Sequence, residues 1–216
     1  MENIKIYYKR NLPHYQPVNA TYFITFRLEG SLPKKVIVRM KEEQAQAEKF
    51  LQNIKDEKER EKKLYIQRKL YFGKFDHLLD KASNGPYWLK NKKVAELVTE
   101  AIHFRDKKKY ELITYSIMPN HVHLVFYVGK HNILHKPQNT SPYIVSSILQ
   151  SLKKYTALRA NRILNRSGTF WHRESFDHVV RDREELKRIV AYVLNNPVKA
   201  GLVSTYKEWK WNYINE

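Results

Sequence analysis

The 216-residue sequence contains no cysteine, which excludes several classes of protein. Without a thiol the chain has no disulfide bond, no thiolate metal site and no cysteine nucleophile. No stretch approaches the roughly 18 apolar residues that cross a bilayer, and charges stand near the start where a signal peptide is apolar. The sequence therefore predicts a cytoplasmic protein whose chemistry uses histidine, carboxylate, hydroxyl or phenol groups.

Acidic residues are also scarce relative to basic ones. The 22 Asp and Glu residues face 40 Lys and Arg residues, so the formal net charge is +18. Hydrophobic residues make up 42% and aromatic residues 13% of the chain, which indicates a folded core beneath this charge. A folded protein with a large positive net charge usually binds a polyanion. Membrane binding is disfavoured, because Tyr and Trp are scattered among the cations instead of gathering on one helix face.

Stretches rich in β-branched and aromatic residues predict three strands, at 21–28, 110–118 and 121–128. The last two flank a Pro-Asn turn, so we expect them to pair antiparallel. Helices are predicted from Asn91 to about residue 102, over about 143–164 and over about 182–194, from apolar spacing and capping residues.

The segment 33–89 differs in amino-acid composition from the rest of the chain. Its run 55–63 contains no apolar residue, and the residues around this run keep helical spacing. We interpret 33–89 as a charged helical insertion within a single domain, 1–216, and 167–216 as a C-terminal helical extension packing on the core. Without the insertion, the order strand, helix, strand, strand, helix predicts an α+β fold. It is the ferredoxin-like split βαβ plan, an antiparallel sheet with helices on one face.

Two histidines lie two residues apart on the strand at 121–128. His121 and His123 leave the same face of that strand, whereas Val122 points to the opposite face. Two neutral imidazoles at this spacing can share one divalent ion, completed by a third protein group and by substrate or water oxygens. On the tripeptide alone, two ordinary surface or hydrogen-bonded histidines are the more frequent explanation.

The helix at about 143–164 brings a tyrosine and an arginine near its apolar stripe. Tyr155 falls at the stripe's edge, about 60° from Leu152, so its ring can be buried while its hydroxyl reaches the sheet. Arg159 falls near the centre of the stripe, where a charge is costly unless something anionic lies opposite. The ordinary alternatives are a boundary tyrosine, a buried salt bridge, or an arginine that extends past the helix end.

Four motifs in order resemble the REP-associated tyrosine transposases, which belong to the single-tyrosine HUH transposases and nickases. HUH denotes His, a bulky apolar residue and His. The resemblance covers the chain from about Thr21 to Leu202, and the order and spacing of the motifs are more specific than any one of them. The motifs are Met118-Pro-Asn-His-Val-His-Leu-Val-Phe126, Ser151-Leu-Lys-Lys-Tyr-Thr-Ala157, Phe170-Trp-His-Arg-Glu-Ser-Phe-Asp-His178 and Asn195-Asn-Pro-Val-Lys-Ala-Gly-Leu202.

The resemblance implies an HUH-type fold and a metal-dependent enzyme that cleaves single-stranded DNA. It further implies strand transfer through a 5′-phosphotyrosine intermediate, on hairpin-forming repeat DNA, without a small-molecule cofactor. Carried onto this sequence, His121 and His123 bind Mg²⁺ or Mn²⁺, and Tyr155 is the nucleophile. Basic residues around this tyrosine and in the tail are expected to contact the phosphates of single-stranded or hairpin DNA. They are Lys153, Lys154, Arg159, Arg162, Arg166 and Arg173.

One position departs from the family pattern. Related single-tyrosine transposases commonly place an amide one helical turn after the tyrosine as the third metal ligand, and this chain has Arg159 there. Guanidinium does not ligate a metal, and Asn161 lies about 120° from Tyr155 round the helix. Either substrate and water complete the metal shell, or the ligand comes from elsewhere. The candidates are His172, Glu174, Asp177 and His178.

Two alternative functions stay open. The first, suggested by Arg159, is a binding protein for structured single-stranded nucleic acid whose catalysis is weak or lost. The second is a phosphodiesterase that uses the histidine-bound metal and water, forms no covalent intermediate and does not need Tyr155.

Overall fold

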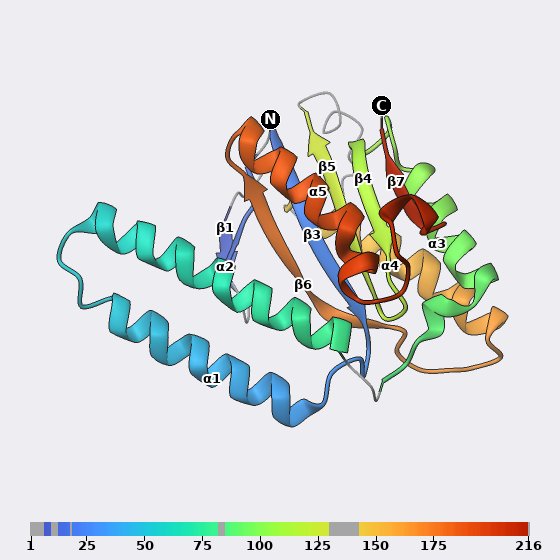
Figure 1. The fold of residues 1–216 in the computed structure, drawn as a ribbon, viewed down its shortest axis with the longest axis horizontal. Helices are drawn as coiled ribbons and strands as arrows, with labels where there is room; N and C mark the ends of the chain where they lie inside the picture. Colours follow the sequence, from blue (N-terminus) through green and yellow to red (C-terminus); the bar gives the residue numbers. More distant parts are fainter. Residues whose placement is uncertain (1–6, 10–12, 18, 82–84, 130–142, 216) are drawn as a thin grey trace. The chain divides into compact units, whose positions relative to one another are not determined.

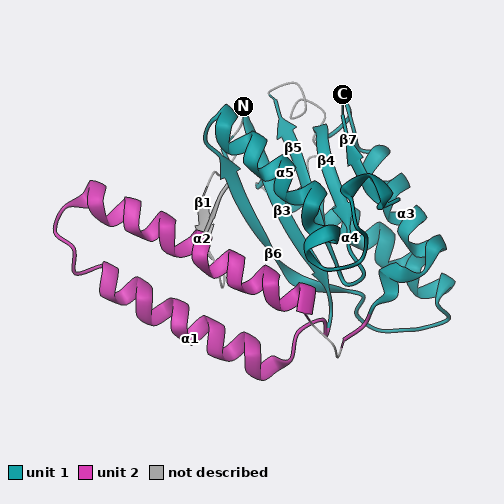
Figure 2. Cartoon of the chain, in the orientation of Figure 1, with its two compact units in different colours: residues 1–29, 87–216 teal, residues 30–86 magenta. Residues whose placement is uncertain are grey.

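The computed structural model describes residues 7–9, 13–17, 19–81, 85–129 and 143–215. The chain divides into two compact units, residues 1–29 with 87–216 and residues 30–86, which Figure 2 colours separately. Each unit is described by itself. Within the described ranges, no helix is both long and apolar enough to cross a membrane.

A five-stranded antiparallel sheet forms the centre of the first unit (Figure 1). Its strands lie in the order β6-β3-β5-β4-β7, so β5 is central and β6 and β7 are the edges. A separate hairpin consists of β1 (Tyr7–Lys9) and β2 (Pro13–Tyr15). The sheet strands are β3 (Ala20–Leu28), β4 (Glu111–Ile117), β5 (His121–Val128), β6 (Trp171–Val180) and β7 (Asn212–Ile214).

Helices α3 (Lys92–His103) and α4 (Ile144–Ile163) cover one face of this sheet. Their apolar residues share a single buried core with alternate residues of β3 and β5, because successive side chains of a strand point to opposite faces. Asn91 caps α3 as the sequence predicts, since its side chain accepts a hydrogen bond from the Val94 amide at 3.3 Å. Short 3₁₀ helices lie before α3, at Trp88–Lys90, and between α5 and β7, at Tyr206–Glu208.

Helix α5 (Arg183–Lys199) lies on the other face of the sheet (Figure 1). The α+β fold with an antiparallel sheet is confirmed, but helices cover both faces instead of one. The stretch 167–216 is also more than a helical extension, because it supplies both edge strands, β6 and β7. The physical reason is Phe23, whose place on the second face of β3 requires cover; its ring packs edge-on against Phe176 of β6 and Tyr192 of α5.

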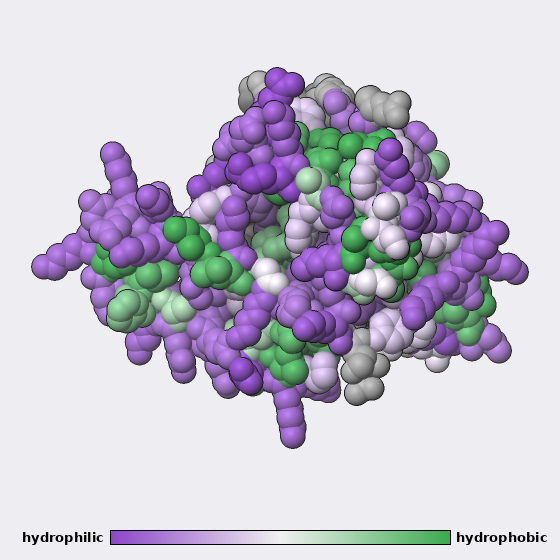
Figure 3. All heavy atoms as spheres, viewed as in Figure 1, coloured by the Kyte–Doolittle hydropathy of each residue, from purple (hydrophilic) through white to green (hydrophobic). Residues whose placement is uncertain are grey.

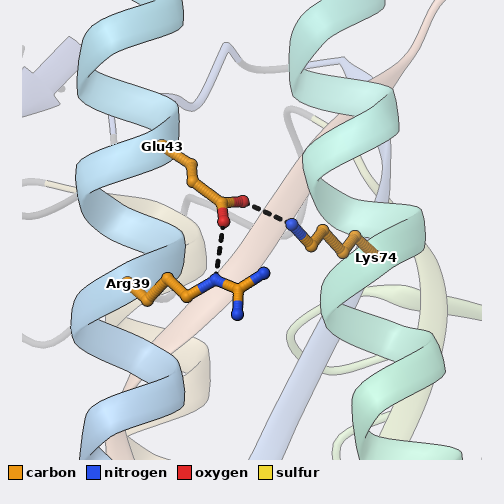
Figure 4. Close-up of polar contacts among 3 residues, drawn as sticks. All are labelled: Arg39, Glu43 and Lys74. Atoms are coloured by element: carbon orange, nitrogen blue, oxygen red, sulfur yellow. Dashed lines mark hydrogen bonds and ion pairs between the residues drawn. The ribbon is translucent and has the colours of Figure 1, made fainter.

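The second unit is a pair of helices, α1 (Lys34–Leu51) and α2 (Glu57–Lys81). Glu43 of α1 accepts a hydrogen bond from Arg39 Nε at 2.8 Å and another from Lys74 Nζ of α2 (Figure 4). Both cations hold the pKa of Glu43 below its ordinary value, and the Arg39 hydrogen bond is the larger cause. Hydrophilic residues cover most of these helices in Figure 3, as expected for a segment this rich in charge.

Candidate functional site

The histidine pair lies on the central strand β5, and both side chains are buried. The Nε2 atoms of His121 and His123 are 3.1 Å apart, and the two ring planes are inclined by 77°. Two ligand atoms about 2.1 Å from one metal and at right angles to each other are about 3.0 Å apart. The pair therefore has the separation of two neighbouring ligands in one metal coordination shell.

The second nitrogen of each imidazole is held by a neighbouring side chain. His121 Nδ1 lies 2.6 Å from Asn120 Oδ1, and His123 Nδ1 lies 2.7 Å from Thr25 Oγ1 on β3. Because an amide oxygen only accepts hydrogen bonds, His121 Nδ1 donates, and the Nε2 of its neutral ring carries the lone pair. Metal-binding histidines are usually oriented by such contacts, so the predicted pair fits a divalent metal.

Helix α5 places an aromatic side chain over this pair. The Tyr192 ring centroid lies 5.7 Å from that of His123 and 6.1 Å from that of Phe23. Asn196 follows one helical turn later and is completely buried. Since residues four apart share one side of a helix, Tyr192 and Asn196 both lie on the side of α5 that faces the sheet.

Tyr155 lies on the opposite face of the sheet from the histidines. Its helix, α4, packs through Leu152 into the core that contains Val122, and alternation along β5 directs His121 and His123 away from that core. The structure therefore does not bring Tyr155 to the histidine pair. A phenol on that face cannot act on a phosphate held at His121 and His123, so the expected pairing of these three residues does not fit the fold.

Arginines surround the ring of Tyr155. The guanidinium carbon of Arg159 lies 4.0 Å from the ring centroid, and that of Arg105 lies 5.7 Å from it. Arg105 is buried after the end of α3 and donates to Ala101 O at 2.7 Å and to Ser151 O at 3.1 Å. Burial lowers the pKa of Arg105. The stripe position of Arg159 is thus explained by stacking on a tyrosine.

The sequence analysis missed the tyrosine and amide of α5. The resemblance implies an amide one helical turn after the nucleophile, and Tyr192 and Asn196 have this spacing where Tyr155 has an arginine. The signal was the spacing of four residues between this tyrosine and this amide. Asn196 lies in the motif that begins at Asn195, and Tyr192 lies just before that motif. The signal was missed because 167–216 was interpreted as an extension, and the third ligand was sought there only between His172 and His178.

The four other candidate ligands all lie on β6, which β3 separates from β5. Among the described residues, none of the four places a ligand atom within 4.8 Å of those of both histidines. Asp177 Oδ2 instead accepts from Gln16 at 3.2 Å, and His178 Nε2 lies 3.3 Å from a Glu185 carboxylate oxygen. Burial lowers the pKa of His172. With Glu174, these residues belong to the edge of the sheet and not to its centre.

Besides Arg159, which stacks on Tyr155, two of the six cations expected to contact DNA have structural partners. Lys153 Nζ donates to Ser175 Oγ at 2.8 Å and to His172 O at 3.0 Å, which ties α4 to the edge strand β6. The Arg166 guanidinium carbon lies 3.7 Å from the Trp88 ring centroid. The other four are exposed: Lys154, Arg159, Arg162 and Arg173.

The fold and site define an α+β protein with a buried, metal-compatible histidine pair on its central strand and a tyrosine over that pair. No family model matches the chain. Over 110 residues it is 26% identical to a Haemophilus influenzae protein named "Putative REP-associated tyrosine transposase", and the alignment covers 48% of this chain and 58% of that protein. This match confirms the resemblance to the REP-associated tyrosine transposases.

A solved structure of a REP-associated tyrosine transposase bound to a REP hairpin is also similar. It aligns with a TM-score of 0.49 and 14% identity, and the alignment covers 95% of this chain and 80% of that one.

Proposed function

We propose that the protein cleaves single-stranded DNA that folds into hairpins and rejoins the strand, with a tyrosine as nucleophile. The observation that carries this proposal is the contact between Tyr192 and the metal-compatible histidine pair. The net charge of +18 supports a nucleic-acid substrate. The name of the Haemophilus influenzae relative supports the same class of reaction.

In the proposed reaction the Tyr192 hydroxyl oxygen attacks the phosphorus of one phosphodiester. A bond forms between this oxygen and the phosphate, and the bond from the phosphate to the 3′-oxygen breaks. The phenol loses its proton, and the departing 3′-oxygen gains one, which leaves a 5′-phosphotyrosine and a free 3′-hydroxyl. No water is consumed, so a second 3′-hydroxyl can reverse the step and join another strand.

His121 and His123 would hold the divalent metal, and the Asn196 amide oxygen is the third ligand that we propose. The tyrosine and amide spacing on α5 supports this assignment. When bound, Mg²⁺ or Mn²⁺ would supply a Lewis acid that polarises the scissile phosphate. The imidazoles favour Mn²⁺ in binding strength. Thr25 and Asn120 would keep both rings in their ligating orientation.

The test is a covalent adduct assay with single-stranded hairpins taken from inverted repeats beside the gene. The strand is labelled at its 3′ end, because a 5′-phosphotyrosine retains that fragment, and Mg²⁺ or Mn²⁺ is supplied. We expect an adduct that survives denaturation in the parent protein and in Tyr155→Phe, and none in Tyr192→Phe. Each variant removes one hydroxyl and keeps the ring, so the two are matched controls.

Three outcomes would contradict this proposal. Loss of the adduct in Tyr155→Phe with retention in Tyr192→Phe would assign the nucleophile to Tyr155. Hairpin binding without nicking or adduct, under both metals, would identify a binding protein. Cleavage without an adduct would indicate water as the nucleophile.

A further inference from the structure

A groove of about 770 Å³ lies between α4 and the edge strand β6. This volume falls within the range of small-molecule sites, about 300–1,000 Å³. Its walls include Gln150 and Lys154 of α4 and Arg173, Ser175 and Asp177 of β6. The groove belongs to the face of the sheet that α4 covers, so it is distinct from the histidine pair.

Alternate side chains of β6 point into this groove and toward the opposite face of the sheet. Ser175 and Asp177 point toward α4 and its surroundings, as their bonds to Lys153 and Gln16 demonstrate. Phe176 points to the other face and packs against Phe23. Because β6 is an edge of the sheet, a flexible strand can pass round it from one face to the other.

The inner part of the groove offers fixed hydrogen-bonding groups. Gln16 is buried, and its Nε2 donates to Asp177 Oδ2 at 3.2 Å and to Ser146 Oγ at 3.3 Å. Its Oε1 accepts from the Val145 amide at 3.1 Å, in the first turn of α4. These bonds hold the Asp177 carboxylate at the groove wall. A carboxylate there suits a ligand with an amino group, such as N4 of cytosine.

Positive charge stands on both walls of the groove. Lys154 extends from α4 and Arg173 from β6, and both side chains are exposed. Lys153 also lines the groove, but its ammonium group donates to three β6 groups, so it serves the fold. Two exposed cations on facing walls, and a carboxylate further along β6 beside the first turn of α4, match a phosphate backbone that carries an amino-bearing base.

We propose that this groove binds a single-stranded DNA segment, with its phosphates on Lys154 and Arg173 and a cytosine or adenine base at Asp177. The inference rests on the proposed single-stranded DNA substrate and adds a second contact for that strand, away from the reacting tyrosine. The motif from Phe170 to His178 thereby acquires a role, because its alternate residues form the β6 wall.

Fluorescence anisotropy with labelled homopolymers of about six nucleotides tests the base preference. The full chain carries Tyr192→Phe, so that no covalent chemistry contributes. Oligo-dC and oligo-dA should bind about tenfold more tightly than oligo-dT, which lacks an amino group. Asp177→Ala, which leaves no acceptor for the amino group, should reduce this preference to about unity. Equal binding of the three homopolymers by the unaltered groove would overturn the proposal.

Salt titrations of the same binding test the two cations. Lys154→Ala and Arg173→Ala should each weaken binding of every homopolymer and reduce the slope of log affinity against log salt by about 0.7. Lys93→Ala is the matched control, since Lys93 is an exposed cation of α3 that lies outside the groove and outside the expected DNA contacts. A slope change in Lys93→Ala equal to that in Lys154→Ala would contradict a groove-bound strand.

A second groove substitution covers the case in which Asp177→Ala does not fold. Gln150 is exposed on the α4 wall, and an amide there can pair with adenine. Gln150→Ala should weaken oligo-dA binding more than oligo-dT binding, and an equal effect on both would count against the proposal. Adduct formation without any homopolymer preference would refute the groove alone. Homopolymer preference without adduct formation would refute the proposed function alone.

Discussion

The ring planes of Tyr192 and His123 are inclined by 66°, with their centroids 5.7 Å apart. One residue comes from the helix that closes a sheet face and the other from the central strand of that sheet. This contact brings the nucleophile that we propose beside a metal-compatible pair, from segments about 70 residues apart and without any contribution from α4. The face that was expected to stay open is therefore the face on which we propose the reaction.

Asn196→Ala should lower the affinity of the protein for Mn²⁺ by about 10- to 100-fold, if its amide oxygen is the third ligand. Binding is measured by titration calorimetry without DNA, so the result does not depend on activity. Asn195→Ala is the matched control, because this neighbouring amide is exposed and donates to Ala191 O at 2.9 Å. Equal affinities of Asn196→Ala and the parent protein would remove Asn196 from the metal site.

Thr25→Val should weaken metal binding although Thr25 itself contacts no metal in our proposal. The substitution keeps the shape of the side chain but removes the hydroxyl that lies 2.7 Å from His123 Nδ1. The ring would lose its fixed orientation, and we expect a loss of Mn²⁺ affinity of about tenfold or more. The buried nitrogen left without this partner should also cost about 1–3 kcal/mol of unfolding free energy. Thr21→Val, on the same strand but away from the histidines, should change neither quantity.

The sequence predicted those parts of the fold that local periodicity encodes. Alternation placed the strands at 21–28 and 121–128 and put His121 and His123 on one face, and the structure agrees with both. The role of α5 could not be found in this way, because covering the second face depends on packing between distant segments. Phe23 alternates onto that face, but nothing local in the sequence tells which helix covers it.

The assignment of Tyr155 illustrates the same limit. Helical spacing correctly put Leu152 in the core and Tyr155 at its boundary, but it carries no information about which sheet face the helix covers. The position of Arg159 near the centre of the apolar stripe suggested an anion opposite its charge, but the structure stacks this guanidinium on Tyr155. The spacing of a tyrosine and an amide four residues later was the more informative signal, and among the described helices Tyr192 with Asn196 satisfies it on the histidine face.

Arg105→Ala should destabilise the protein by about 2–4 kcal/mol, because a buried guanidinium then no longer joins α3 to α4. Arg105 Nη2 donates to the carbonyl oxygen of Ser151 at 3.1 Å and to its hydroxyl oxygen at 3.0 Å. Arg105→Lys should recover only part of the loss, since an ammonium lacks the planar fork of donors. Urea unfolding followed by tryptophan fluorescence measures the change. Lys108→Ala, an exposed neighbour, is expected to remain close to the parent protein.

Glu43 should titrate below its ordinary pKa of 4.5, because Arg39 and Lys74 stabilise its charged form. A carboxyl whose folded-state pKa is lowered stabilises the folded state above its unfolded pKa, and this contribution is lost as pH falls through the folded value. NMR titration of the Glu43 side-chain carbon follows the change directly. Arg39→Ala should raise the pKa most, and Lys74→Ala by less. Lys69→Ala on the same helix should leave the Glu43 titration unchanged, and a shift in that variant would show that general surface charge, not the two hydrogen bonds, sets the value.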